Sequence, residues 1–349
     1  MRTTYRRDDV ELLLKDITGL VEPQSTQERE RQIQMGRHYC EMLPIEYSPS
    51  REYMEIYREA LRLFSDSTAR AVGILADKIL EQRGRKVVLV SLARAGIPVG
   101  ILLKRYLRWK YGLETPHYSI SIIRGRGIDQ NAVEYLLREY APGQLLFVDG
   151  WIGKGAILRE LEKDVKDFPG VSSELAVLAD PANVTSLCGT HEDILIPSSC
   201  LNCTVSGLVS RTFLRDDIIG PRDFHGAVYY GELQEQDLSY GFIQEIESRF
   251  QMENVPEPEL LQRKGLDEVL EIGERFQVGD VNLIKPGIGE TTRVLLRRVP
   301  WKVLLGENSR GERELEPILR LAQEKQVPVE YYPLKNYKAC GIIKKLADA

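Results

Sequence analysis

One acidic residue stands where an apolar strand is expected to end and a glycine-rich loop to begin. The run Leu145–Leu158 reads LLFVDGWIGKGAIL, with Asp149 after four apolar residues and three glycines around Lys154. Backbone N–H groups in such a loop, at the start of a helix, can bind a phosphate. Phosphorylated-sugar chemistry needs an acid beside an anion-binding loop. The run therefore predicts a site for a phosphorylated sugar.

The segments around this run alternate between predicted strands and predicted helices. Short apolar runs predict strands at 87–91, 117–123, 145–148 and 175–178, and helical patterns cover 51–83, 98–110, 130–140 and 156–165. Such alternation predicts βαβ units and a parallel sheet. Ligands of these sheets bind outside the carboxyl ends of the strands, where Asp149 is expected to lie.

Three glycine-bearing loops follow successive predicted strands: SLARAGIP at 91–98, RGRGID at 124–129 and DGWIGKGA at 149–156. The set resembles the type I phosphoribosyltransferase family, which uses 5-phosphoribosyl-1-pyrophosphate (PRPP). The resemblance implies catalytic roles for Asp149, Arg124 and Arg126. It also implies that pyrophosphate and sugar phosphate bind to Ser91, Ala93, Arg94, Ala95, Gly96, Gly150, Ile152, Gly153, Lys154, Gly155 and Ala156.

The third loop departs from that family's pattern. Gly150 replaces the second acid, and Ile152, Lys154 and Ala156 occupy the segment where the family has threonines. Lys154 is expected to compensate as a point charge on phosphate. The implied cofactor is Mg²⁺ held by oxygens of PRPP, and no side chain is assigned as a metal ligand. The resulting hypothesis is an enzyme that displaces pyrophosphate from PRPP, or from a related sugar phosphate, by an unknown nucleophile.

A second resemblance rests on three longer segments. HYCEMLPIEY at 38–47, ILIPSSCLNCTVSGLVSRT at 194–212 and DFHGAVYYGEL at 223–233 resemble a bacterial family of tellurite- and stress-resistance gene clusters. Its members are described as phosphoribosyltransferase-like, and some are labelled cysteine protease StiP. The label implies an alternative in which Cys200 is a nucleophile and His225 or His191 its base. A further alternative is a non-catalytic regulator that senses nucleotides or RNA.

The last 69 residues differ in charge from the rest of the chain. Residues 281–349 carry 13 Lys and Arg against 8 Asp and Glu, whereas the remainder has a net charge of −10. A basic region favours a polyanionic partner. The region resembles a Pelota-like RNA-binding domain, which implies contacts to structured RNA through Gly289, Glu290, Thr291, Thr292 and Arg293.

Together these features predict an α/β protein with two domains. A phosphoribosyltransferase-like StiP-family domain is expected at 1–252, a linker containing Pro256 and Pro258 at 253–280, and a small α/β Pelota-like domain at 281–349. No segment is apolar enough to span a membrane, and no signal peptide is visible. The five cysteines, an odd number, favour reduced thiols in a cytoplasm. A homodimer is compatible with these features.

Overall fold

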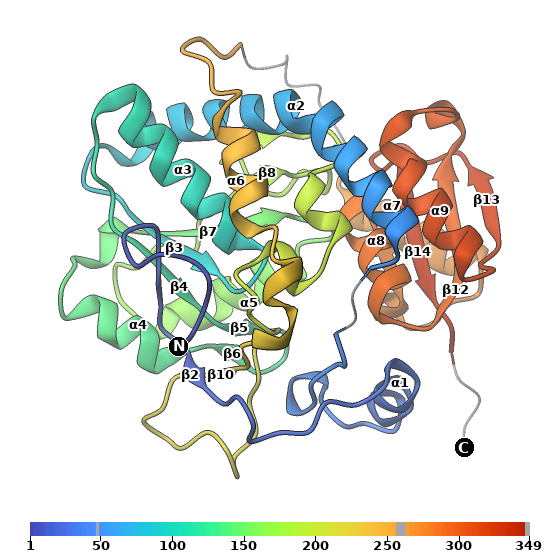
Figure 1. Ribbon diagram of the computed structural model, residues 1–349, viewed down its shortest axis with the longest axis horizontal. Helices are drawn as coiled ribbons and strands as arrows, with labels where there is room; N and C mark the ends of the chain where they lie inside the picture. Colours follow the sequence, from blue (N-terminus) through green and yellow to red (C-terminus); the bar gives the residue numbers. More distant parts are fainter. Residues whose placement is uncertain (47–48, 256–262, 346–349) are drawn as a thin grey trace.

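A six-stranded parallel sheet forms the centre of the larger unit in the computed structural model, which describes residues 1–46, 49–255 and 263–345 (Figure 1). All neighbouring strands of this sheet are parallel. Their order is β1 (Glu11–Leu12), β4 (His117–Ile120), β3 (Val88–Leu92), β7 (Leu145–Trp151), β8 (Leu175–Ala179) and β9 (Cys188–Thr190). Every connection must therefore cross the sheet, and the strand ends that carry the predicted loops share one edge.

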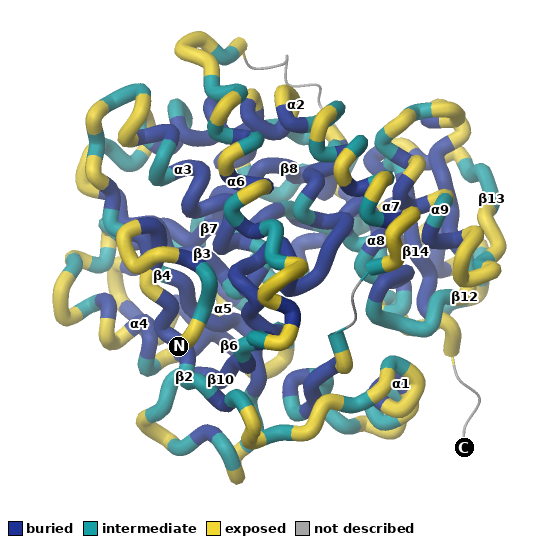
Figure 2. The backbone as a smooth tube through the Cα atoms, in the orientation of Figure 1, coloured by how far each residue is buried: buried dark blue, intermediate teal, exposed yellow. Residues whose placement is uncertain are grey.

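Helices cover both faces of this sheet, which is why its strands are apolar on both sides (Figure 2). Leu89 and Val148 belong to the core cluster on one face, and Val90 and Phe147 belong to the cluster on the other. The first face is covered by α2 (Arg51–Arg83), α3 (Gly96–Tyr111) and α6 (Ser239–Glu247). The second is covered by α4 (Gln130–Leu137) and α5 (Ala156–Asp164).

The C-terminal unit is a smaller mixed sheet with helices (orange and red in Figure 1). Its strands lie in the order β11 (Ile284–Pro286), β14 (Ala339–Ile343), β12 (Pro300–Gly306) and β13 (Val329–Tyr332), and only β12 and β13 pair in parallel. Its helices are α7 (Gly265–Arg275), α8 (Ile288–Arg297) and α9 (Glu316–Glu324). Ile288 and Val303 of this unit belong to the same apolar cluster as α2 and α3. The two units therefore share one continuous core.

Shorter elements complete the larger unit. They are α1 (Thr26–Gln34), β2 (Lys15–Asp16) paired with β10 (Gly226–Ala227), and the hairpin of β5 (Ile122–Ile123) with β6 (Gly127–Ile128). Short 3-10 turns occur at Tyr39–Glu41 and Pro197–Cys200. The turn at Tyr39–Glu41 begins at His38, whose side chain caps it.

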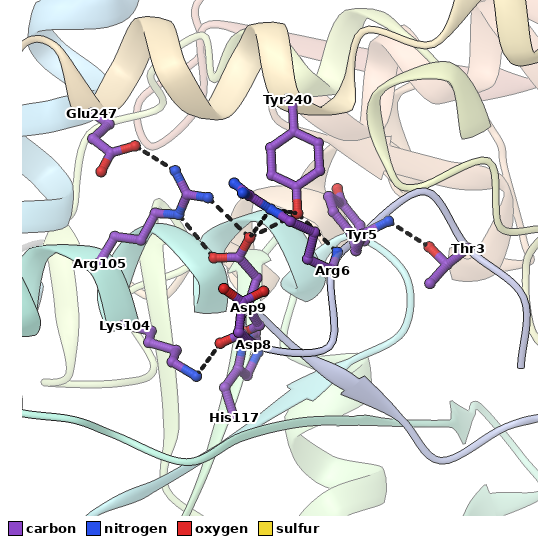
Figure 3. Close-up of polar contacts among 10 residues, drawn as sticks. All are labelled: Thr3, Tyr5, Arg6, Asp8, Asp9, Lys104, Arg105, His117, Tyr240 and Glu247. Atoms are coloured by element: carbon purple, nitrogen blue, oxygen red, sulfur yellow. Dashed lines mark hydrogen bonds and ion pairs between the residues drawn. The ribbon is translucent and has the colours of Figure 1, made fainter.

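The N-terminal segment is tied to α3 and α6 by one buried carboxylate (Figure 3). Asp9 accepts hydrogen bonds from Arg105 at 2.9 Å and from the Tyr240 hydroxyl at 2.7 Å. Arg105 also donates to Glu247 at 2.5 Å. The backbone carbonyl of Asp9 lies 2.8 Å from Nδ1 of His117. This network holds the strand β1 against β4.

The predicted fold class, a parallel-sheet α/β unit followed by a small α/β unit, is confirmed. The predicted strand at 117–123 is two strands, because the chain bends between β4 and the β5–β6 hairpin. Pro256 and Pro258 lie outside the described residues. Within the described residues, no helix combines the length and apolar character that crossing a membrane requires.

Candidate functional site

A cavity of about 250 Å³ lies where the carboxyl end of β7 meets the C-terminal unit. Ala95 from the first predicted loop, Arg124 from the second and the segment 151–156 from the third all line it, together with Asp149. The C-terminal unit closes the cavity with Lys285, Pro286, Glu290, Arg293 and Arg298. The structure thus brings three predicted loops to one place, where they face the second unit.

Asp149 ends the buried part of β7 and faces this cavity. Its carboxylate accepts a hydrogen bond from the backbone N–H of Gly150 at 2.8 Å. Burial raises the pKa of Asp149 to about 6, although that hydrogen bond and the charge of Arg293 oppose the rise. The carboxyl group is therefore poised to exchange a proton near neutral pH.

The glycine-rich loop after Asp149 is covered by the C-terminal unit. Lys154 donates through Nζ to the backbone carbonyl oxygens of Val281 and, at 2.8 Å, Ile284. The Tyr337 hydroxyl donates to the carbonyl of Gly153 at 2.6 Å. A Cβ on Gly153 would lie 3.1 Å from Cγ of Glu290, so that a carboxylate packs against the loop. These hydrogen bonds of Lys154 join the two units, and burial lowers the pKa of Lys154 to about 7, so its side chain does not stand free for a phosphate.

Other residues predicted for this site point elsewhere. The hydroxyl of Ser91 lies 2.7 Å from Nε2 of His117 inside the sheet. A Cβ on Gly96 would lie 2.3 Å from the carbonyl oxygen of Val148, so this glycine serves the close packing of α3 on β7. Arg126 is directed to Glu41, to which it donates at 2.9 Å. These contacts explain the residue types by packing and local ion pairs.

The predicted RNA-binding segment packs against the larger unit. A Cβ on Gly289 would lie 2.4 Å from the indole of Trp151, and the guanidinium of Arg293 stacks over the same ring at 4.4 Å. The side chains of Thr291 and Thr292 are buried, and they donate to the carbonyls of Lys285 and Ile288. Glu290 pairs with Arg293 at 3.2 Å. In this arrangement the segment faces the cavity and not open solvent.

Cys200 and His225, the predicted nucleophile and base, lie in different environments. Burial raises the pKa of Cys200 to about 12, and its backbone carbonyl accepts from the Tyr53 hydroxyl at 2.8 Å. Nδ1 of His225 lies 2.9 Å from the hydroxyl of Ser121, and burial lowers its pKa to about 4. The separate buried contacts of Cys200 and His225 account for both residues through packing and hydrogen bonding.

Two other cysteines do contact histidines. Nδ1 of His38 lies 2.9 Å from Sγ of Cys40 in the 3-10 turn at Tyr39–Glu41. Nε2 of His191 lies 3.4 Å from Sγ of Cys188, and its Nδ1 lies 3.6 Å from the carboxylate of Asp180. Sequence reasoning considered His191 only with Cys200 and did not pair His38 with Cys40.

Comparison with known proteins identifies the larger unit. Residues 3–247 match the family described as "Tellurite-like stress resistance cysteine protease StiP". The chain belongs to the StiP family. A relative from Acinetobacter baylyi strain ADP1, named "Cysteine protease StiP", is 34% identical over 98% of this chain and 94% of its own length. Residues 263–345 of this StiP-family chain match the PELOTA RNA binding domain, which supports RNA binding by the C-terminal unit.

These findings correct the main functional hypothesis. The expectation of a phosphoribosyltransferase that uses PRPP is wrong, because both the StiP family and the Acinetobacter relative carry the name of a cysteine protease. The structure supplies a physical reason. Glu290 packs against the loop that was expected to hold the sugar phosphate, and Lys154 of that loop is bonded to the C-terminal unit. The expectation of Mg²⁺ rested on oxygens of PRPP rather than on side chains, and it stays a prediction.

Proposed function

We propose that this StiP-family chain is a cysteine peptidase in which Cys40 is the nucleophile and His38 is the general base. The observation that carries the proposal is the 2.9 Å contact between Nδ1 of His38 and Sγ of Cys40. A nucleophile within hydrogen-bond reach of an oriented base is the arrangement that activates a thiol. All five cysteines are buried, and among the described residues they form no disulfide, which also supports a cytoplasmic, reducing location.

The ring of His38 is held in place from its other side. Its Nε2 lies 3.0 Å from the backbone carbonyl of Arg124, and the ring packs against Tyr39 with 4.6 Å between centroids. A carbonyl at Nε2 favours the tautomer with its proton there, which leaves Nδ1 as an acceptor shared by the Cys40 backbone N–H, at 3.4 Å, and the Cys40 thiol. The carbonyl of Arg124 thus takes the orienting role that a third group has in catalytic triads.

Electrostatics favours an uncharged pair at neutral pH. Burial raises the pKa of Cys40 to about 11, although Arg126 opposes the rise. Burial also lowers the pKa of His38 below its ordinary value, and Arg126 adds to this effect. The pair therefore starts as thiol and neutral imidazole. During attack on a peptide carbonyl, the proton passes from Sγ to Nδ1, and His38 then returns it to the leaving amine.

A cavity adjoins this pair, although neither His38 nor Cys40 lines it and Cys40 is buried. Tyr39 and Arg124, which flank His38, line a cavity of about 710 Å³. Phe276 and Trp301 lie on its other side, so aromatic surface is present for side chains of a peptide. The size is within the range of sites that bind small ligands and short peptide segments.

The pair of Cys188 and His191 fits the proposal less well. Cys188 lies on β9 and belongs to the apolar core cluster of the sheet, and its contact with His191, 3.4 Å, is longer than the 2.9 Å contact of Cys40 with His38. The cluster also holds Phe147 and Val177 of neighbouring strands. We therefore assign a packing role to Cys188 and use it as a matched control.

The test combines covalent labelling with proteolysis. The full chain is incubated with a peptidyl epoxide, and the modified cysteine is located by mass spectrometry. Selective labelling of Cys40, with loss of hydrolysis of an unfolded protein substrate in Cys40→Ala but not in Cys188→Ala, is the expected result. Hydrolysis that survives in Cys40→Ala, with both variants folded by circular dichroism, would refute the assignment.

A further inference from the structure

A second cavity of about 250 Å³ adjoins the one beside the glycine-rich loop, shares Asp149 with it and is strongly basic. Two acids, Asp149 and Glu290, line it. Against them stand six cations, four of them from the C-terminal unit: Arg94, Arg211, Lys285, Arg293, Arg297 and Arg298. We call this group the basic cavity.

Three of the six cations have carboxylate partners. Arg94 pairs with Glu46 at 3.0 Å, Arg298 with Glu30 at 2.6 Å, and Arg293 with Glu290 at 3.2 Å. These pairs account for one half of the positive charge and hold the paired side chains in fixed positions.

The other three cations, Arg211, Lys285 and Arg297, form no ion pair with any described residue. Arg211 instead stacks over the ring of Tyr39 at 4.8 Å. The Nε atom of Arg297 is buried and has no hydrogen-bond partner within the part of the chain that the structure describes. Partly buried guanidinium groups without partners are costly, so an occupant that supplies negative oxygens is called for.

Burial, and after it the repulsion between neighbouring cations, disfavours the charged forms of these side chains. Burial lowers the pKa of Arg297 to about 9, and the charge of Arg94 adds to the decrease. Burial lowers the pKa of Arg211 to a similar value, with a contribution from Arg29. Burial also lowers the pKa of Lys285 to about 8, against the attraction of Glu290. A cluster of depressed cations in a cavity is typical of a functional site.

We propose that the basic cavity binds a terminal phosphate group of an RNA strand. Guanidinium groups match phosphate oxygens in bidentate geometry, and two of those here, Arg211 and Arg297, have no carboxylate partner among the described residues. The unit that supplies four of the six cations matches an RNA-binding domain. This inference does not depend on the peptidase assignment.

The shape of the cavity selects an end of the strand. About 250 Å³ accommodates a phosphate and its sugar but not a duplex. Tyr39 also lines the cavity, and its ring, which Arg211 and His38 cover, holds Arg211 in position. The 5′-phosphate of an RNA and the phosphate of a free nucleotide have the same chemistry. We favour the RNA strand over the free nucleotide as the ligand because the C-terminal unit matches an RNA-binding domain.

The test uses the full chain and two short single-stranded RNAs of one sequence, with a 5′-phosphate or a 5′-hydroxyl. We expect the phosphorylated RNA to bind at least about tenfold more tightly, the worth of one or two charge-assisted hydrogen bonds. Arg297→Gln should erase this preference. Arg310→Gln, an exposed arginine of the same unit, should retain it.

A second readout separates a binding site from a structural cluster. Since Arg297 is repelled by its neighbours, Arg297→Gln should raise the melting temperature of the free protein while the phosphate preference disappears. Equal affinity for the two RNAs overturns the proposal. Tight binding of a nucleoside monophosphate, with no advantage for the phosphorylated RNA over it, assigns the cavity to a free nucleotide and overturns the RNA source.

Discussion

Gly289 of α8 lies directly against the indole of Trp151 at the end of β7. A Cβ at position 289 would come within 2.4 Å of the ring, so only glycine allows this approach. Arg293, one turn later, stacks on the same indole at 4.4 Å. The helix that carries the RNA-domain motif is therefore seated on the strand that carries Asp149. This contact joins the candidate RNA-binding unit to the cavity.

A methyl group at Gly289 should weaken the seating of the C-terminal unit. We expect Gly289→Ala to lower the free energy of unfolding by about 1–3 kcal/mol through overpacking, more than the gain of up to about 1 kcal/mol from helix propensity. Gly241→Ala, in α6 with nothing within 4 Å of the added methyl, is the matched control and should be neutral or stabilising. Chemical denaturation measures both, and equal effects would show that the contact with Trp151 is loose.

A buried carboxyl group makes the docking of the two units sensitive to pH. Asp193 accepts hydrogen bonds from the backbone N–H groups of Ile288 at 2.9 Å and Lys338 at 2.8 Å. Burial raises the pKa of Asp193 to about 7, although these hydrogen bonds oppose the rise. Folding then favours the protonated form. The contribution of this group to stability is present below its unfolded pKa of about 4 and is lost as pH rises toward 7.

The test compares Asp193→Asn with the unmodified chain across this pH range. The difference in unfolding free energy between them should change by an amount on the order of 3 kcal/mol between pH 4 and pH 7, with the unmodified chain losing stability. Asp167→Asn, an exposed position, should follow the unmodified profile. A difference that is constant with pH would show that Asp193 stays ionised throughout.

Sequence patterns predicted the larger sheet because buried parallel strands are unbroken apolar runs, as in β3 and β7. They did not predict β1 or β9, since strands of two or three residues carry no readable periodicity. Asp149 and Arg124, both chosen from the sequence, line one cavity, because loops that follow parallel strands share an edge. Arg211 and Lys285 gave no signal, as single cations far apart in the sequence meet only after folding.

The Gly289–Arg293 motif shows a different limit of sequence reasoning. Its residue types match an RNA-binding unit, yet Thr291 and Thr292 turn inward and Glu290 faces the loop at Gly153. A motif specifies the local helix start, whereas the face that it presents depends on the partner unit. His38 and Cys40 likewise belong to the segment 38–47, whose sequence resembles the StiP family. Their contact arises from a 3-10 turn that residue spacing alone does not predict.

The proposed peptidase should show a distinctive pH profile. His38 must be neutral to accept the proton, and burial lowers its pKa below the ordinary 6.5. Hydrolysis should therefore fall only as the medium becomes more acidic than the ordinary histidine pKa of 6.5. The pKa of Cys40, raised to about 11 by burial, predicts no loss of activity up to pH 9. If the rate of hydrolysis already decreases when the pH is lowered from 8 to 7, the general base is another group. His38→Gln should abolish hydrolysis at every pH.

The N-terminal network around Asp9 should carry a large share of the stability of the larger unit (Figure 3). The side chain of Asp9 is 8% exposed, and it pairs with Arg105, which is 15% exposed. Although burial raises the pKa of Asp9, hydrogen bonds from Arg105 and Tyr240 lower it below its ordinary value. Its contribution is therefore present above the unfolded pKa and is lost as pH falls through the lower folded pKa.

Replacing this carboxylate leaves Arg105 partly buried, with Glu247 as its remaining carboxylate partner among the described residues. We expect Asp9→Asn to lower the free energy of unfolding by about 3 kcal/mol at pH 7, because breaking a buried pair strands its other charge. Asp8→Asn is the matched control, since Lys104 contacts the backbone carbonyl of Asp8, which the substitution keeps. Urea denaturation at pH 7 and pH 3 measures both. The cost of Asp9→Asn should shrink at the lower pH, and a cost that does not change with pH would mean that packing, rather than charge, explains the loss.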